Sequence, residues 1–228
     1  MDKKEYALYK PIFEMHWRTF CDRFGIEDKK MPTVLSTLLK HYAGKGRHYH
    51  SIVHIVKLIE ELRRLRKEQP AWFLDPVEDA AIELAIWFHD VIYDTSKHDN
   101  EEQSAQLAEA YALRLGFSRA VGQRAKDYVR ATDHKQFAKD FGAQLVCDVD
   151  LLSLALPPTA FDENTRLIRL EYQQYTDEEW RQGRLAWGES FLDPNKRPSI
   201  YQTEYYRNRE ETYARANLAR MVEDLRAI

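Results

Sequence analysis

Residues 51–67 read SIVHIVKLIEELRRLRK, and the apolar positions in this stretch recur at intervals of three and four residues. Such spacing is typical of an amphipathic helix that turns one face toward a core. The apolar positions are Ile52, Val53, Ile55, Val56, Ile59, Leu62 and Leu65. The basic run at the end suits a helix C-terminus, and Gln69-Pro70 is expected to close the helix.

The same periodicity continues along most of the chain. It predicts further helices over residues 76–88, 100–115, 118–132, 136–156, 164–172, 178–191 and 204–225. Glycine and proline are scarce, with eight of each, and no segment alternates like a strand. We therefore expect an all-α fold that forms a single domain over residues 1–228. Its core would lie at about 34–156, the segment 157–161 (PPTAF) would be a turn, and the C-terminal helices of 160–228 would pack on the core.

Composition and charge exclude several classes of protein. The 228 residues carry a formal net charge of -3, so no basic field favours duplex nucleic acid as a partner. The start of the chain has no apolar signal region, and the longest apolar runs, such as AAIELAIWF, are too short to cross a membrane. Cys21 and Cys147 stand alone, without a disulfide framework. We expect a cytoplasmic protein with no membrane partner.

Two histidine motifs are embedded in apolar sequence. His50 and His54 are four residues apart, which on a helix places both on one face. His89-Asp90 ends a strongly apolar helix, so both polar side chains are carried against the core. Burial of an imidazole with a carboxylate is unfavourable unless the two pair or coordinate a cation. A second copy, His98-Asp99 in TSKHDNEE, has no apolar support and is expected in a solvated loop.

A third motif, LVCDVDLLSLAL, places two acidic residues in an otherwise buried helix. Asp148 and Asp150 cannot lie on one helical face, so at most one of them can aim at a centre shared with His54 and His89. A buried carboxylate with no Lys or Arg neighbour in sequence requires a metal or a distant partner. The three motifs are therefore candidates for one shared centre, with a metal or a distant partner left open for the buried carboxylate.

The order His … His-Asp … Asp, with each member in an apolar helix, resembles the HD superfamily of metal-dependent phosphohydrolases. The match falls on His54, His89, Asp90 and Asp150, the last through VDLL. Further similarity lies in RHYHSIVHI, FHDVIYD, NEEQSA, ATDH, DVDLLSLA, IRLEY and the GR of RQGR. The resemblance implies an HD-type helical bundle with additional C-terminal helices. It also implies that these four side chains bind a divalent cation (Mn, Fe, Co, Ni, Zn or Mg).

The activity that the resemblance implies is hydrolysis of a small-molecule phosphate ester, with a nucleotide phosphomonoester as the leading substrate. The alternatives are a nucleotide phosphodiesterase and a non-catalytic nucleotide-binding HD regulatory module. A module without catalysis is expected to lose metal positions, whereas this chain retains all four. A homodimer is one of the assemblies left open.

Two local resemblances suggest catalytic roles. YHSIVH is similar to the YHNxxH signature of cyclic-nucleotide phosphodiesterases, which implies that His50 protonates the leaving oxygen while His54 binds metal. HDVIYD is similar to the HDVVED of guanosine tetraphosphate hydrolases, where Asp94 falls on the second acidic residue. Tyr93 replaces the first acidic residue, which argues against that substrate. Asp94 would then act as a base or orient water.

A phosphate group requires cationic donors, and arginine supplies the better-matched fork. The candidates for this contact are Arg47, Arg169 and Arg184. His134, in the ATDH segment, would be a second-metal ligand or a phosphate donor.

Overall fold

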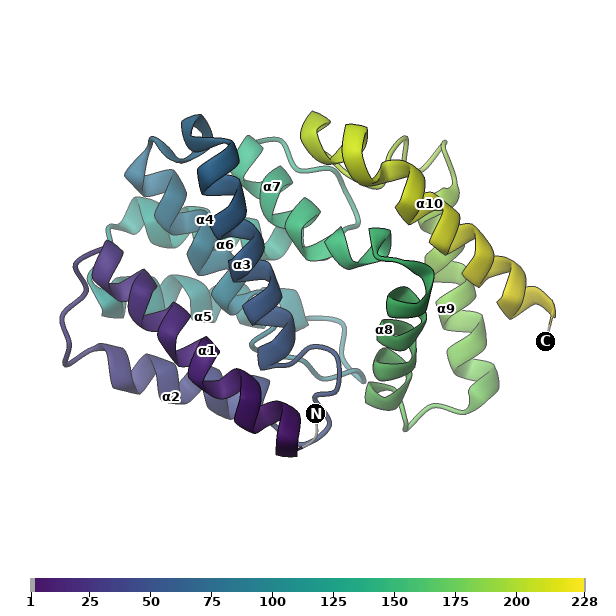
Figure 1. Cartoon of the computed structure of the whole chain (residues 1–228), viewed down its shortest axis with the longest axis horizontal. Coiled ribbons are helices and arrows are strands. Elements are labelled where there is room, and N and C mark those ends of the chain that lie inside the picture. Colours follow the sequence, from purple (N-terminus) through teal and green to yellow (C-terminus); the bar gives the residue numbers. More distant parts are fainter. Residues whose placement is uncertain (1–2, 228) are drawn as a thin grey trace. The chain divides into compact units, whose positions relative to one another are not determined.

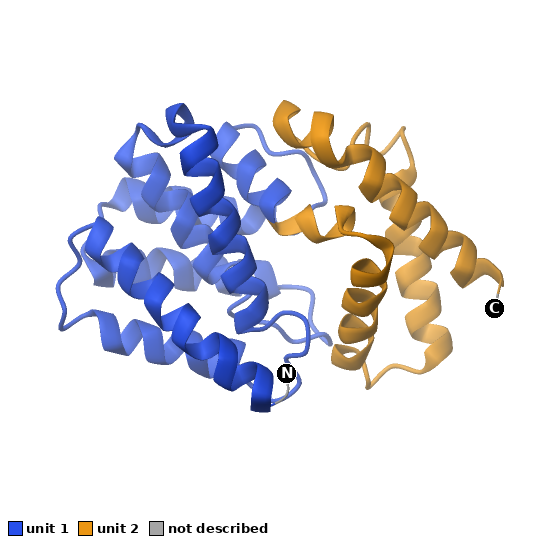
Figure 2. Ribbon diagram, in the orientation of Figure 1, with its two compact units in different colours: residues 1–149 blue, residues 150–228 orange. Residues whose placement is uncertain are grey.

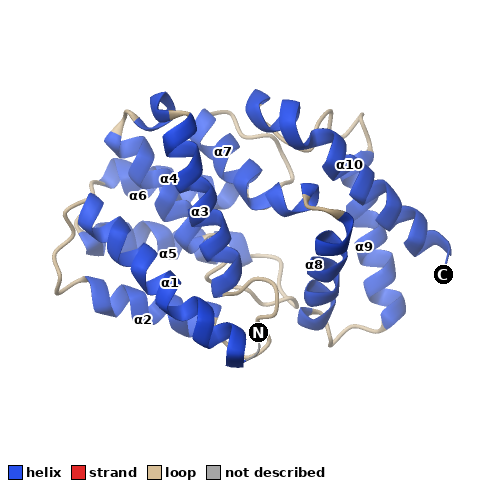
Figure 3. Cartoon of the chain, viewed as in Figure 1, coloured by secondary structure: helices blue, strands red, loops and turns tan. Residues whose placement is uncertain are grey.

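The computed structural model describes residues 3–227, and helices joined by loops make up this part of the chain, with no strand (Figure 3). It contains ten α-helices and two 3₁₀ helices. Their bounds are α1 Lys3–Arg23, α2 Met31–Tyr42, α3 Ile52–Glu68, η1 Pro70–Phe73, α4 Pro76–Phe88, α5 Asn100–Leu115, α6 Arg119–Ala131, α7 Phe141–Asp150, η2 Leu151–Ala155, α8 Pro158–Glu171, α9 Asp177–Leu192 and α10 Glu204–Ala227.

The chain folds as two compact units, Met1–Val149 and Asp150–Ile228 (Figure 2). The first unit carries α1 to α6 and all of α7 except its last residue, and the second carries η2 and α8 to α10 (Figure 1). Whether the whole chain acts as one domain stays a prediction. Among the described residues, no helix combines the length and the apolar character that a membrane span requires.

Helix α4 is the core helix of the first unit. Asp75 caps its N-terminus by accepting a hydrogen bond from the Val77 backbone, and Pro76 occupies its first position, where proline is favoured. From Ala80 to Phe88 every residue is buried, as expected of a helix that is packed on all sides. Neighbouring helices α3, α5 and α6 pack against it. The C-terminal end of α4, which leads into His89-Asp90, therefore lies in the protein interior.

Aromatic rings hold the C-terminal end of α4 against α1. Phe13 and Trp17 both contact the Trp87 ring edge-on, and their ring centroids lie 5.0 and 5.3 Å, respectively, from that of Trp87. Edge-to-face pairs contribute about 0.5–1.5 kcal/mol beyond the area that they bury. The position of α1 thus helps to fix the residues that precede His89.

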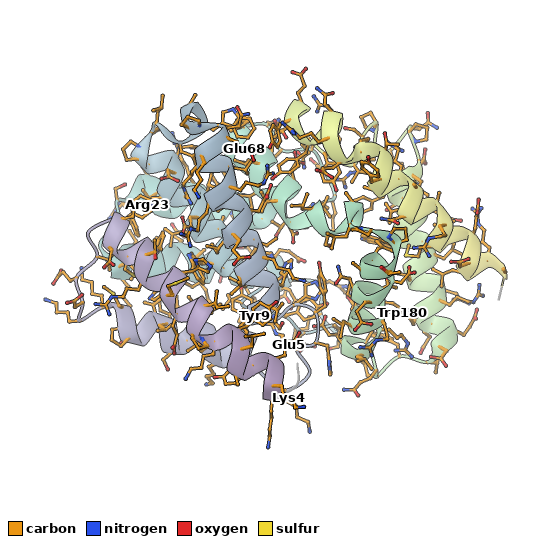
Figure 4. The ribbon with its side chains drawn as sticks, in the orientation of Figure 1. Lys4, Glu5, Tyr9, Arg23, Glu68 and Trp180 are labelled. Atoms are coloured by element: carbon orange, nitrogen blue, oxygen red, sulfur yellow. The ribbon has the colours of Figure 1, made fainter. Side chains whose placement is uncertain are left out.

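A buried ion network joins α1, α3 and α4. Arg66 of α3 lies 2.6 Å from Glu83 and 2.6 Å from Asp79, both on α4. Arg23, at the C-terminal end of α1 (Figure 4), pairs with the same Glu83. The Glu83 side chain is only 3% exposed, so its charge depends on these two guanidinium groups. Arg66, in the basic end of the 51–67 stretch, therefore forms ion pairs with α4 in addition to lying near the C-terminus of α3.

The second unit is built on α10. Asn217 of α10 donates hydrogen bonds to the carbonyls of Leu154 and Leu156, each at 2.8 Å. These bonds fix the end of η2 and the turn that follows it.

Helix α9 begins with a capping box, in which Thr176 and Glu179 each accept a hydrogen bond from the other's backbone.

The predicted all-α class is confirmed, and several predicted helices match closely. Helices α4 and α5 have the predicted bounds, and α6 differs only by its two cap residues. The predicted helix over 136–156 is wrong in extent, because α7 begins at Phe141 and ends at Asp150. Asp140 accepts a hydrogen bond from the Ala143 backbone and so starts the helix later than expected. Helices α1 and α2 were not predicted. The predicted turn at 157–161 is wrong, because α8 already begins at Pro158, where proline suits the first helical position.

Candidate metal centre

The first ligand-bearing segment is the start of α3. Ser51 caps this helix by accepting a hydrogen bond from the Val53 backbone at 3.3 Å, so regular helix begins at Ile52. His54 lies in the first turn and is 5% exposed. His50 precedes the cap and is half-buried, and its ring lies 5.8 Å from that of His54. The two histidines are therefore close in space, although only His54 is within the helix.

The second segment is the C-terminal end of α4, where His89 is 2% exposed. Its Nδ1 atom lies 3.0 Å from the carbonyl oxygen of Ile86. A carbonyl only accepts, so Nδ1 carries the ring proton and donates it. The lone pair of His89 is therefore on Nε2. That arrangement is the one seen in metal-binding histidines, which donate their other ring N–H to a fixed acceptor.

The Nε2 atoms of the two buried histidines face each other. The distance between Nε2 of His54 and Nε2 of His89 is 3.3 Å. Asp90 adds a carboxylate oxygen, Oδ2, which lies 3.1 Å from Nε2 of His89 and 3.9 Å from Nε2 of His54. Helices α3 and α4 thus bring two ring nitrogens and one oxygen to the same point.

Asp150, the last residue of α7, supplies a further carboxylate. Ligand atoms of His54, His89 and Asp150 all lie within 4.8 Å of one another. Asp148 is fully buried and does not belong to this group. The prediction that only one of the two acidic residues of α7 can face the centre agrees with this placement. Among the described residues, this trio is the group of His, Cys, Asp and Glu side chains that could hold a metal ion.

The donor set fits a divalent transition ion. Two ligand atoms about 2.1 Å from one ion, at a right angle to each other, are about 3 Å apart. The spacings of 3.3 Å between His54 and His89 and of 3.1 Å between His89 and Asp90 are close to that value. Imidazole nitrogens suit Zn, Fe and Ni, and carboxylate oxygens suit Mn and Mg. A cation would take the place of the His54–His89 hydrogen bond and accept the lone pairs of both Nε2 atoms.

His50 lies at the edge of this group. Its Nε2 atom is 4.0 Å from Oδ2 of Asp90. The ring lies over Tyr93, with centroids 4.3 Å apart and an angle of 33° between the planes, and Tyr49 meets it edge-on at 4.7 Å. His50 is therefore near the Asp90 carboxylate, and its ring is held by aromatic neighbours on two sides.

Arg47 has a role that the sequence did not predict. The residue is 7% exposed, and its guanidinium group donates hydrogen bonds to three backbone carbonyls. These acceptors are His50 at 2.9 Å, Asp90 at 2.8 Å and Val91 at 3.0 Å. The predicted phosphate contact from Arg47 therefore competes with a set of backbone bonds that already engage both terminal nitrogens.

Asp94 lies in the exposed loop after α4. Its Oδ1 atom accepts hydrogen bonds from the backbone and the hydroxyl of Ser96, at 3.0 and 2.6 Å. These bonds hold the pKa of the Asp94 carboxyl below its ordinary value. Asn100 bonds the Asp94 backbone at both its N–H and its carbonyl. Asp94 therefore also helps to form the loop, and its predicted role as a base or in orienting water stays a prediction.

Sequence reasoning missed Glu101, in the first turn of α5. The side chain is half-buried, and burial, followed by the neighbouring Asp90 charge, raises the pKa of its carboxyl. Acidic residues are common in a first helical turn, so the sequence offered an ordinary explanation for it. The signal available was its place in NEEQSA, directly after the loop that follows His89-Asp90.

The remaining predicted residues lie in other settings. His134 is half-buried in the turn after α6, with a left-handed φ of 54°. Arg169 donates to the carbonyls of Tyr172 and Tyr175 and pairs with Asp177 at 2.7 Å. Arg184 stacks on the Trp187 ring, 4.0 Å from its centroid, in the helix that also carries Trp180 (Figure 4). The predicted substrate contacts of these three residues stay predictions.

His98 and Asp99 are exposed, as predicted for a solvated loop.

No protein-family model, curated protein or solved structure matches the chain. The candidate site is therefore defined by its own geometry.

Proposed function

We propose that this protein is a metal-dependent phosphohydrolase of the HD type that acts on a small phosphate ester, with a nucleotide phosphomonoester as the leading substrate. The observation that supports the proposal is the group of His54, His89 and Asp150, with the Asp90 carboxylate 3.1 Å from His89. The order of these residues along the chain is the one that resembles the HD superfamily. The same four side chains would hold the divalent cation.

A divalent cation bound by these residues would polarise a phosphoryl oxygen and lower the pKa of a water molecule. The protein's contribution is to keep the ligand atoms oriented. The Ile86 carbonyl accepts a hydrogen bond from Nδ1 of His89, and His54 lies in the first turn of α3. The bond to Ile86 fixes both the tautomer and the direction of the His89 ring.

Proton transfer requires groups beside the ligands. His50 lies 4.0 Å from Asp90 and can carry a proton on Nε2, which fits the role of acid toward a leaving oxygen. We therefore expect His50 to influence turnover, with Asp94 as the candidate for a base or for orienting water.

The direct test is a hydrolysis screen. Metal-stripped protein is incubated with nucleoside monophosphates, cyclic nucleotides and simple phosphate esters, with Mn, Co, Ni, Zn or Mg added in turn. We expect phosphate release from a monoester with at least one of the metals, and no release by the His89→Ala variant. The control is His98→Ala, which alters an exposed histidine nine residues along the chain.

The alternatives give different results in the same screen. A phosphodiesterase would open cyclic or linear diesters and leave monoesters intact. A regulatory module would release nothing from any ester, while a nucleotide would still raise the melting temperature of the protein. The absence of both hydrolysis and binding across all metals would contradict the proposal.

A further inference from the structure

Arg47 is a buried cation at the junction of the two histidine motifs. It precedes α3 in sequence, yet two of its three carbonyl acceptors, Asp90 and Val91, follow α4. The third acceptor is the carbonyl of His50. One guanidinium group therefore links the segment that leads into His54 with the segment that contains Asp90.

The surroundings of Arg47 hold the guanidinium plane in place. The rings of Tyr42 and Tyr93 lie 5.3 and 5.1 Å from its central carbon, within the range of cation–π contacts. Tyr42 also donates a hydrogen bond to the carbonyl of Trp87, at 3.0 Å, near the end of α4. Val91, which accepts from Arg47, also takes part in a hydrogen bond with His41. The end of α4 is thus tied to residues 41–47 at several points.

We infer that Arg47 is a positioning residue of the metal centre, which sets the distance between the His54 and Asp90 ligand groups by bonding the His50 carbonyl, four residues before His54, and the carbonyls of Asp90 and Val91. This inference rests on the proposed metal site. The bonds need a fork: Arg47 uses one terminal nitrogen on His50 and Asp90 and the other on Val91. Lysine keeps the charge, but its donors are all on one ammonium nitrogen, so it cannot bond all three carbonyls as the two terminal nitrogens of arginine do.

A basic residue near a helix C-terminus can also act as a simple cap for the last carbonyls. The capping role and the positioning role predict different effects of the Arg47→Lys substitution. A cap that works through charge is largely preserved in Arg47→Lys, whereas a spacing role is lost. Arg66 supplies the matched control, because it too is a poorly exposed arginine bonded to α4, but through Asp79 and Glu83 in the ion network.

The experiment measures Co²⁺ binding by calorimetry and by the visible spectrum of the bound ion, without any substrate. It compares the unaltered protein with Arg47→Lys, Arg47→Ala and Arg66→Lys, and follows folding by circular dichroism. We expect Co²⁺ affinity to fall about 10- to 100-fold in both Arg47 variants, with a changed spectrum, and to stay within about twofold in Arg66→Lys. Added guanidinium ion should restore part of the affinity of Arg47→Ala.

Co²⁺ affinity that is unchanged in folded Arg47→Lys would overturn the inference and leave the metal site intact. A loss of affinity that follows the loss of helicity equally in Arg47→Lys and Arg66→Lys would also overturn it, because Arg47 would then act only on the fold. If the unaltered protein bound no Co²⁺ at all, the proposed function would fail instead. Phosphate inhibition that weakens in Arg47→Lys at unchanged Co²⁺ affinity would return Arg47 to the role of substrate contact.

Discussion

The ring of His89 is held by the carbonyl oxygen of Ile86, which lies 3.0 Å from its Nδ1 atom and one turn earlier along α4. The ring proton therefore lies on Nδ1. We predict that nitrogen NMR spectra of metal-free protein show His89 as the Nδ1–H tautomer. Addition of zinc should then shift the Nε2 resonance and leave the Nδ1 proton in place. A spectrum with the proton on Nε2 would contradict this orientation.

The two histidines of the YHSIVH segment should differ in their effect on metal content. The Nε2 atoms of His54 and His89 are 3.3 Å apart, whereas Nε2 of His50 lies 4.0 Å from the Asp90 carboxylate. We predict that His54→Ala lowers metal content by more than half, and that His50→Ala keeps the metal and lowers turnover about 100-fold or more. Elemental analysis and a phosphate-release assay measure the two effects. Equal metal loss in both variants would show that His50 is a ligand.

The buried ion network should stabilise the fold without influencing the metal. In Glu83→Gln one carboxylate of the network is lost, and Arg23 and Arg66 keep Asp79 as their acidic partner. Loss of hydrogen bonds to a charged group costs about 1.5–3 kcal/mol. We predict a decrease of this size in the free energy of unfolding by urea, with metal content unchanged.

The control for that measurement is the exposed pair formed by Glu163 and Arg166 on α8, at 2.7 Å. Its loss in Arg166→Met should change the free energy of unfolding by less than about 0.5 kcal/mol, because exposed pairs contribute little. A similar change in Glu83→Gln and Arg166→Met would mean that the interior network contributes no more than a surface pair.

His16, buried on α1, should make stability depend on pH. Burial, followed by the nearby Arg63, holds the pKa of His16 below 6.5, while Glu60 and Glu83 act in the opposite direction. The unfolded chain then takes up a proton at this ring at a higher pH than the folded chain does. The contribution of His16 is therefore complete above about pH 6.5 and is lost as the pH falls through the lower folded pKa.

We predict that the stability difference between the unaltered protein and His16→Gln shrinks as the pH is lowered from about 7 to about 5. Urea unfolding at several pH values measures this difference. A difference that grows on acidification would mean that Glu60, 3.7 Å from His16, stabilises a protonated ring.

Much of the fold follows from local patterns in the sequence. Helix α5 was predicted with its observed bounds because Gly116 ends it in a left-handed conformation that glycine adopts readily. Helix α1 carries the same kind of apolar stripe at Phe13, Trp17 and Phe20, so its signal was present and was not used. The start of α7 was predicted wrongly, because the apolar periodicity does not show that Asp140 acts as a cap.

The candidate site could be predicted where chemistry restricts the choice. Three of the four residues assigned as ligands by resemblance, His54, His89 and Asp150, form one group that could hold a metal ion, and Asp90 lies 3.1 Å from His89, so the role of all four as ligands stays a prediction. Arg47 could not be assigned correctly, because its three acceptors are backbone carbonyls and leave no trace in the sequence. Glu101 was missed for a similar reason, since its raised pKa depends on burial and on the nearby Asp90.

The central claim is that His54, His89, Asp90 and Asp150 hold one divalent cation. The most direct measurement is a calorimetric titration of metal-stripped protein with Mn, Co, Ni and Zn. It compares the unaltered chain with His89→Ala and Asp150→Ala, and His98→Ala is the control. The account predicts about one ion per chain in the unaltered protein and in His98→Ala, and none at micromolar concentration in the other two. Full and equal binding in His89→Ala and Asp150→Ala, or no binding in the unaltered protein, would contradict it.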